Sequence, residues 1–268
     1  MTQRGFALLA VLWTLTAITA VAGAALAAVR LGEATTRNRV LLARAAWARE
    51  SCIEILQARY AQDASLRGLD TVDLGRGTWC AASLEDPSSK LNINLADRAA
   101  LATVMHAVVR HQSAVDSLVA ALLDWRRGGV LADLWELRSV RGFTDTVVTS
   151  LAPFLTTRGT GVINVNTAPR EVLSVLPGMT EEAVAVIMMR RASGRIPNAD
   201  ALVGWLSPGS RAVFLASYPE FVRTAVFSAP ELVGVVAGGA RGTPLVARVT
   251  LTTVPVAGRL AVIRRETE

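Results

Sequence analysis

The sequence predicts an α+β protein: one long N-terminal helix packed on a small antiparallel sheet, with a large all-α insertion. Three observations predict this arrangement. An apolar and then amphipathic segment occupies residues 6–61, a helical motif is repeated within residues 91–219, and β-branched runs fill residues 220–268. Because the helix-forming and strand-forming patterns are segregated along the chain, the expected class is α+β.

Residues 6–29 carry no charged side chain and predict a membrane-spanning helix. At about 1.5 Å per residue the segment is about 36 Å long, which exceeds the apolar core of a bilayer, about 30 Å. The short polar chain before it carries one cation, Arg4. Because cations are retained on the cytoplasmic side, everything after Arg30 is expected in the periplasm. A secretory signal peptide cleaved within the Ala-rich residues 22–28 stays an alternative.

The helix is predicted to continue beyond the membrane over residues 33–61, which contain neither proline nor glycine. Apolar residues recur there at spacings of three and four, which places them on one face of a helix. They are Leu41, Ala45, Ala48, Cys52, Ile55 and Leu56. This face is expected to pack on a periplasmic domain. The Gly and Asp residues within 68–75 are expected to form a turn that closes the segment.

Residues 91–219 are predicted to form two related helical units, because one motif occurs twice in this region. Leu-Asn-Ile-Asn-Leu-Ala-Asp-Arg at 91–98 corresponds to Ile-Asn-Val-Asn-Thr-Ala-Pro-Arg at 163–170. Each copy is expected to begin with a short strand and to continue into a helix. The asparagines of the motif are Asn92, Asn94, Asn164 and Asn166, and Thr167 is expected to cap the second helix.

Gly142 and Gly178 each belong to a segment that looks like the turn of a helix-hairpin-helix unit. In DNA-binding hairpins two glycines allow backbone N–H groups to approach a phosphate. Here Thr144 and Thr180 stand in place of the second glycine, so a side chain occupies the position where a phosphate would approach. The region is also close to neutral, and nucleic acid is therefore not expected as a partner.

The last part of the chain is predicted to supply the sheet, because its runs are rich in β-branched residues. The expected strands are 231–236, 245–254 and 256–263, with another near 78–84. The glycine-rich residues 238–242 are expected to form a hairpin turn. A phosphate-binding loop is disfavoured because no helix opens after them and no Lys-Ser/Thr pair follows.

No catalytic or metal-binding constellation is recognisable. His106 and His111 are the only histidines, and their spacing of five places them on different faces of a helix. The sequence contains no Gly-x-Ser-x-Gly, His-Glu-x-x-His or Gly-Lys-Ser/Thr stretch, so the chain is not expected to be an enzyme. Cys52 and Cys80 are too few for a zinc site. They are either one disulfide in an exported domain or two small buried residues.

The N-terminal segment Met1-Thr-Gln-Arg-Gly-Phe6 resembles the leader of type IV prepilins. The resemblance implies cleavage after Gly5 by a prepilin peptidase and N-methylation of the new terminus at Phe6. Most pilins carry a glutamate at the fifth mature position, which is Ala10 in this chain. A carboxylate inside a bilayer is costly unless it is paired. Absence of this glutamate is characteristic of the minor pseudopilin K family of type II secretion systems.

The resemblance to that family covers essentially the whole chain. It implies a pilin-like domain with an insertion of two SAM-like, helix-hairpin-helix units, and the leader and the motif at 162–170 are its most specific parts. The implied divisions are a leader at 1–5, a transmembrane part at 6–29, an α/β domain at 30–90 and 220–268, and the insertion at 91–219.

The resemblance also implies a role: a non-enzymatic subunit at the tip of the pseudopilus. There it would help to initiate assembly and the export of folded proteins from the periplasm. The implied partners are minor pseudopilins I and J, the prepilin peptidase, the inner membrane and exported proteins. No cofactor is expected. Calcium sites of the family need convergent oxygens, whereas Asp124-Trp125 is followed here by two arginines, so no metal is carried over.

The alternative function is a membrane-anchored helix-hairpin-helix DNA receptor of the competence type. Such a protein is expected to have Gly-Φ-Gly turns and a basic patch, and to lack both the duplicated half and the C-terminal sheet. The threonines at 144 and 180, the repeat and the β-branched C-terminal runs all disagree with these expectations. The exported substrates and the interface residues are not encoded in any pattern of the sequence.

Overall fold

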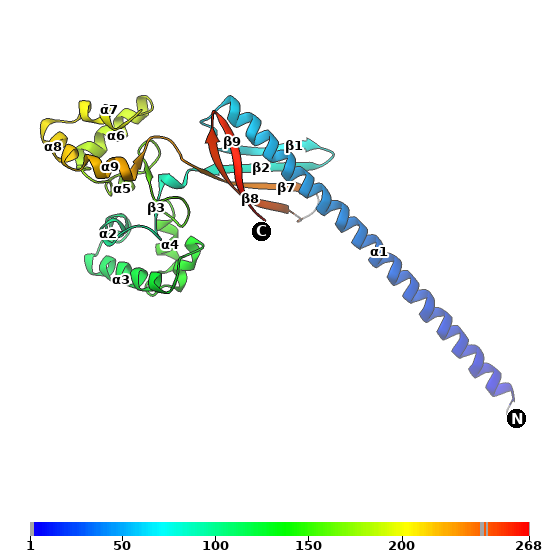
Figure 1. Ribbon diagram of the computed structural model, residues 1–268. Helices are drawn as coiled ribbons and strands as arrows, with labels where there is room; N and C mark the ends of the chain where they lie inside the picture. The colour runs from blue at the N-terminus through cyan, green and yellow to red at the C-terminus, as the bar shows by residue number, and fades with distance from the viewer. Residues whose placement is uncertain (1–2, 242–243, 245, 268) are drawn as a thin grey trace.

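The structure is a computed structural model that describes residues 3–241, 244 and 246–267, with side chains from residue 11 onward. A single helix, α1 (Gln3–Gln62), runs along one face of an antiparallel sheet and then projects far beyond it (Figure 1). The sheet has five strands in the order β1-β2-β7-β8-β9. These strands are β1 (Gly68–Gly75), β2 (Thr78–Glu85), β7 (Leu232–Ala240), β8 (Val246–Val256) and β9 (Arg259–Thr267).

The C-terminal half of α1 forms as the spacing of its apolar residues predicts. Ala45, Ala48, Cys52 and Leu56 are buried against the sheet, and Leu41 and Ile55 are half-buried at the margin of that face. Ile53 and Tyr60 are buried as well. Burial of this face, rather than helix propensity, accounts for most of the stability of such a helix.

The turn predicted at residues 68–75 is wrong, because these residues form strand β1. Leu69, Val72 and Leu74 are more buried than the aspartates between them, which face solvent. This alternation is typical of an edge strand with one covered face. The turn lies immediately afterwards, where Arg76 and Gly77 both have positive φ, as a two-residue type I′ hairpin requires.

The hairpin turn predicted at residues 238–242 begins later than expected, because β7 continues through Gly238 and Gly239 to Ala240 and the turn starts at Arg241. A Cβ on Gly238 would collide with the backbone nitrogen of Arg49 in α1. A Cβ on Gly239 would lie 2.7 Å from the ring of Trp79. The glycines are therefore in the strand because α1 and Trp79 approach its backbone too closely for any side chain.

The insertion leaves the sheet at the end of β2 and returns at the start of β7. Its first half contains η1 (Pro87–Ser89), β3 (Leu91–Asn92), α2 (Arg98–His106), α3 (Gln112–Gly128), η2 (Leu134–Ser139), α4 (Asp145–Leu151) and β4 (Leu155–Thr156). Its second half contains β5 (Ile163–Asn164), α5 (Arg170–Leu173), α6 (Glu181–Ser193), α7 (Ala199–Trp205), α8 (Pro208–Ala216), α9 (Tyr218–Thr224) and β6 (Ala225–Val226). Each half is closed by a two-residue parallel ladder, β3 with β4 and β5 with β6.

The described residues form two separate cores. One is formed by residues of the insertion from Leu91 to Ala225, and the other lies between α1 and the sheet, from Cys52 to Leu260. Phe221 of α9 belongs to the first core, so the boundary predicted at residue 219 falls inside a helix of the insertion. The α+β class, with its long helix, antiparallel sheet and helical insertion, is confirmed.

Candidate functional site: an apolar helix and a duplicated insertion

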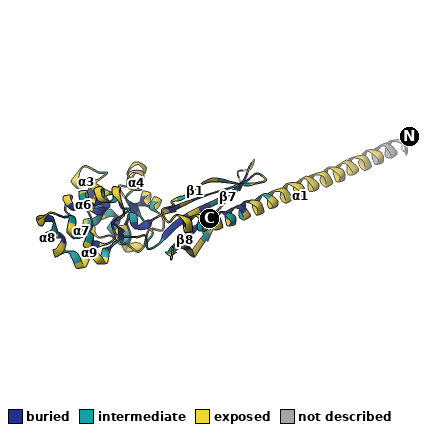
Figure 2. Cartoon of the chain, turned by 90° about the horizontal axis from the view of Figure 1, so that it is seen from above, coloured by how far each residue is buried: buried dark blue, intermediate teal, exposed yellow. Residues whose placement is uncertain are grey.

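The N-terminal half of α1 is an exposed apolar rod. Every described residue from Val11 to Val40 is exposed, and Figure 2 shows this stretch in yellow along its length. This stretch is strongly apolar, and none of its described residues is buried. Thr14, Thr16 and Thr19 donate their hydroxyls to carbonyls of the same helix, so these three donors are satisfied without water. The helix is long and apolar enough to be a single-pass membrane anchor.

The predicted processing residues lie in the first turns of α1. Gly5, Phe6 and Ala10 have helical backbone, and their side chains lie outside the described part of the structure, as do Met1 and Thr2 entirely. Cleavage after Gly5 and methylation of Phe6 therefore stay predictions.

The second asparagine of each repeated motif fastens a distant loop. Asn94 donates its Nδ2 to the carbonyl of Leu131 and accepts from the N–H of the same residue, both at 2.9 Å. Asn166 makes the same pair of bonds with Ile196, also at 2.9 Å. Its Nδ2 also donates to the carbonyl of Phe227. The sequence repeat is therefore also a structural repeat. In each copy the asparagine amide makes the two backbone hydrogen bonds that a neighbouring strand would otherwise make.

An arginine repeats beside each asparagine. Arg126 at the end of α3 donates to the carbonyl of Ala96 at 2.6 Å, and Arg191 at the end of α6 donates to the carbonyl of Ala168 at 2.5 Å. Burial lowers the pKa of Arg191 from its usual value. The two arginines are closer together in the sequence than the two motifs are. A comparison at one fixed offset therefore finds the motif and misses the arginines.

The first asparagines differ between the halves. Asn92 donates to the carbonyls of Arg158 and Gly159 within its own half. Asn164 instead donates to the buried carboxylate of Asp86, at 2.7 Å from Oδ2, and so ties the second half to the segment that follows the sheet.

Thr167 does not cap the helix as predicted. Its hydroxyl donates to Oδ2 of Asp86 at 2.7 Å, and the N-cap position of α5 is Pro169, without a side-chain bond. In the first copy Asp97 occupies the corresponding place and accepts from the N–H of Ala100. The motif Asn-x-Asn-Thr therefore positions the insertion relative to the sheet.

The two hairpin-like turns occupy different places in the two halves. Gly178 lies between α5 and α6, with φ +74°, whereas Gly142 lies between η2 and α4, with φ +93°. Both glycines face protein. A Cβ on Gly178 would lie 3.0 Å from the Cα of Phe214, and a Cβ on Gly142 would lie 3.0 Å from a methyl of Leu118. Thr144 and Thr180 are the N-caps of α4 and α6 and accept from backbone N–H groups there. These turns present a capped, protein-facing backbone instead of a phosphate cradle.

Cys52 of α1 and Cys80 of β2 are paired in the structure, with Cα atoms 5.8 Å apart. Both are fully buried, and the link joins the helix to the sheet it packs on. The sequence left this pairing open because it contains no distance information.

The calcium that the family resemblance implies does not fit the residues at Asp124. The carboxylate of Asp124 pairs with Arg127 at 3.0 Å, and a second arginine, Arg126, lies in the same last turn of α3. Among the described residues no group of three or more His, Cys, Asp or Glu side chains could hold a metal ion. His106 ends α2 and His111 precedes α3, and both are exposed.

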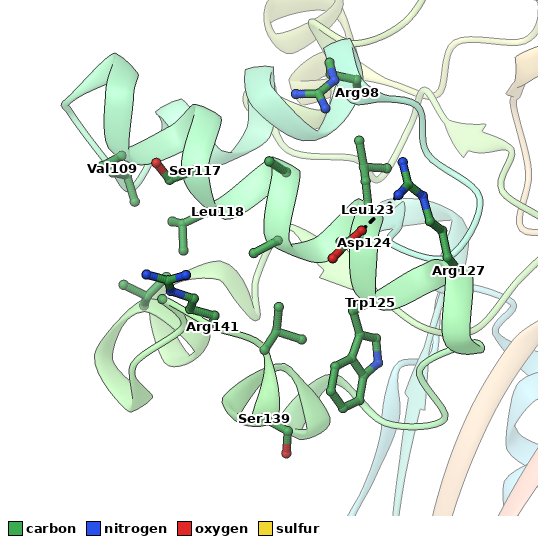
Figure 3. Close-up of a pocket in the computed structure, with 16 residues that line it drawn as sticks. Arg98, Val109, Ser117, Leu118, Leu123, Asp124, Trp125, Arg127, Ser139 and Arg141 are labelled. Carbon is green, nitrogen blue, oxygen red and sulfur yellow. Dashed lines mark hydrogen bonds and ion pairs between the residues drawn. The ribbon is translucent and has the colours of Figure 1, made fainter.

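An open groove of about 1160 Å³ lies in the first half of the insertion (Figure 3). Helix α3 forms one wall, and η2 with the turn at Gly142 forms the other. Leu118 and Trp125 point from α3 toward the opposite wall, and Arg141 lies on that wall. No sequence pattern predicted this groove, because its walls come from segments that are separate in the chain.

A long N-terminal helix lying on a small antiparallel sheet is the architecture of pilin-like proteins. No protein-family model and no curated protein matches the chain. Among solved structures, it is similar to a chain of the GspK-GspI-GspJ complex from the type 2 secretion system of enterotoxigenic Escherichia coli. The two share a TM-score of 0.58 and 13% sequence identity over 88% of this chain and 99% of that chain. The likeness shows that the two chains share a fold, and this α+β fold with a long N-terminal helix is the one that the sequence predicted.

Proposed function

We propose that this protein is the minor pseudopilin K of a type II secretion system: a non-enzymatic, membrane-anchored subunit at the tip of the pseudopilus. The observation that carries the proposal is a single helix that is exposed and apolar in one half and buried against an antiparallel sheet in the other. Such a helix can reside in the membrane before assembly and among neighbouring helices after it.

The position of the insertion supports a place at the tip. It is attached to the end of the sheet farthest from the exposed part of α1 (Figure 1). In a filament whose subunits are stacked along their helices, the insertion would occupy the space of the subunit above. A subunit of this shape therefore fits the last position, where nothing is stacked upon it, and the absence of a carboxylate at Ala10 agrees with that place.

The proposed organisation follows from the same points. Residues 1–5 are a leader on the cytoplasmic side, removed by a prepilin peptidase, and residues 6–29 span the inner membrane. The sheet domain and the insertion are in the periplasm. The partners are minor pseudopilins I and J, since the similar structure is a complex of GspK with GspI and GspJ. Exported proteins reach the tip from the periplasm.

N-terminal mass spectrometry of the membrane-extracted protein tests the proposal. We expect a mature chain that begins with N-methyl-Phe6, and a Gly5→Leu variant that keeps its first five residues. Cleavage between residues 22 and 28 would remove the anchor and overturn the proposal. A salt-dependent affinity of the protein for duplex DNA, micromolar or tighter, would favour the competence-type receptor instead.

A further inference from the structure

The two halves of the insertion differ at the contact between their second and fourth helices. In the second half, Glu182 of α6 accepts from the N–H of Ser207 at 3.0 Å and from its hydroxyl at 2.7 Å. It also accepts from the hydroxyl of Ser210 at 2.6 Å. These bonds hold α6 against the start of α8. In the first half the corresponding residue of α3 is Ser117, whose hydroxyl donates to Ser113 of its own helix at 2.8 Å.

The correspondence of Ser117 with Glu182 is fixed by its neighbours. The buried residues of α3 and α6 match when the two helices are aligned on the arginines at their ends, Arg126 and Arg191, which make equivalent bonds. The matching pairs are Leu118 with Ala183, Val119 with Val184, and Leu122 with Ile187. The first half therefore has a short side chain where the second half has a bridging carboxylate.

The groove of about 1160 Å³ lies at this unbridged contact. Ser117 and Leu118 line it from α3, and Val140 and Val147 line it from the other wall. Trp125 forms one end and is 41% exposed, a large aromatic surface left in contact with water. Such a concave apolar surface with an aromatic wall is typical of sites that bind a partner.

The charges around the groove are mostly positive. Arg98, Arg127 and Arg141 line it together with one carboxylate, Asp124, which is paired with Arg127. The nearby Asp145 is paired with Arg138, at 2.8 Å. Arg98 and Arg141 form no ion pair within the described part of the chain. The groove is thus complementary to carboxylates next to an apolar side chain.

We propose that this groove binds an acidic segment of a partner protein. An apolar side chain of the segment packs on Leu118, Val147 and Trp125, and its flanking carboxylates face Arg98 and Arg141. The segment occupies the space that corresponds to the hydrogen bonds of Glu182 in the second half. Binding therefore connects α3 with the opposite wall of the groove, formed by η2 and the turn at Gly142. This goes beyond the proposed tip role by giving the chemistry of a segment that the tip recognises.

Other anionic partners suit the groove less well. It lies in the insertion, at the end of the molecule away from the membrane part of α1 (Figure 1), so phospholipid head groups do not reach it. The arginines alone would also pair with a phosphate, but the hairpin mode of nucleic-acid binding additionally needs free backbone N–H groups. At the neighbouring turn, the hydroxyl of Thr144 already accepts from the N–H of Val147, and Gly142 faces Leu118.

Site-specific photocrosslinking in secreting cells tests the proposal with the full-length chain. A photoreactive residue at Val147 is expected to crosslink to a protein segment in which an apolar residue is flanked by Asp or Glu, identified by sequencing the crosslinked peptide. The same probe at Val213, exposed on α8 of the second half, is the matched control. Crosslinks to nucleic acid, to lipid, to a second copy of this chain or to no molecule would each overturn the proposal.

Binding of synthetic peptides provides the second measurement, by fluorescence anisotropy with the full chain in detergent. The probe is a nine-residue peptide with a central leucine and two glutamates on each side, and glutamines replace the glutamates in its control. We expect Arg141→Glu to weaken binding of the acidic peptide about fivefold or more, and Arg223→Glu on α9 to leave it unchanged. Ser117→Glu should also weaken binding of the acidic peptide, because it places a carboxylate in the groove beside Leu118 that repels the glutamates of the peptide. Equal affinity for the two peptides contradicts the proposal.

The proposal and the tip role can fail separately. Variants of Arg141 and Ser117 are expected to keep the mature N-terminus and to co-purify with the other minor pseudopilins, because neither residue lies on α1 or on the sheet. Loss of crosslinking at Val147 with correct N-terminal processing therefore counts against the groove alone. A mature chain that does not begin at Phe6 counts against the proposed tip role alone.

Discussion

Two carboxylates join elements of the insertion through hydrogen bonds without a cationic partner. Asp86 is buried and accepts from Asn164, Thr167 and the N–H of Ser88. Glu182 is exposed and accepts three bonds from the start of α8. Hydrogen bonds to an ionised carboxylate are stronger than neutral ones, so these residues fix how the helices are placed.

Glu182 is expected to make the stability of the insertion depend on pH. The hydroxyl of Ser210, and then the hydroxyl and N–H of Ser207, lower the pKa of the Glu182 carboxyl against a small opposing effect of burial. Because the folded-state pKa is below the unfolded value, the stabilisation is present above the unfolded pKa and is lost as the pH falls through the folded pKa. Glu182→Gln should therefore lower the melting temperature near neutral pH, with little difference from the parent in acid.

Glu181→Gln is the matched control for this measurement. Glu181 lies in the same first turn of α6 and is exposed, so the variant removes an equal charge from the same helix end. The two variants are compared by thermal unfolding, followed by circular dichroism from neutral pH to acid. If both lose the same stability at every pH, the bonds to Ser207 and Ser210 contribute nothing specific.

At the scale of elements, the contact between α1 and β7 depends on one glycine. Gly238 has no side chain because the backbone of α1 passes directly over it, and a Cβ would also lie 2.6 Å from the carbonyl of Ala45. Gly238→Ala is expected to push α1 from the sheet and to lower the free energy of unfolding by about 3 kcal/mol. Unfolding of the full chain in detergent, followed by circular dichroism, measures the loss.

Gly204→Ala is the control for Gly238→Ala. Gly204 lies inside α7, and a Cβ there would meet no atom within 4 Å. The alanine should therefore stabilise the protein by about 0.5–1 kcal/mol through its higher helix propensity. A Gly238→Ala variant as stable as the parent would contradict the close packing of α1 on β7.

Sequence patterns predicted the elements whose information is local and failed where packing decides. The apolar spacing of α1 and the repeated Asn-x-Asn motif could be found because their signals lie within one segment. The strand at 68–75 was misassigned because its glycines and aspartates are also turn residues. Gly238 was misassigned because the reason for a glycine there is the N-terminal helix, far away in the sequence. The groove beside Trp125 needs two walls from distant segments, and no pattern brings them together.

The whole molecule divides into a sheet domain and an insertion whose two chain connections lie side by side. Glu85 at the end of β2 lies opposite Val233 near the start of β7, in a continuous antiparallel ladder. All of the intervening chain therefore leaves and returns between two adjacent strands. The buried residues of the core beneath α1 include none between Leu84 and Leu232, and from that stretch Ala229 alone packs on its margin, so this core depends little on the insertion.

This division predicts that the insertion can be removed without unfolding the sheet. Replacing residues 87–231 by Asn-Gly should convert β2 and β7 into a hairpin, since Asn-Gly favours the turn that joins paired strands. We expect the shortened chain to unfold cooperatively and to keep the Cys52–Cys80 pair, as shown by circular dichroism and by mass spectrometry under non-reducing conditions. On the proposed tip role, the subunit without its insertion should also tolerate another subunit above it, so disulfide crosslinking should find it along the pseudopilus as well as at the tip. A shortened chain that folds but stays at the tip would show that the insertion does not determine its position.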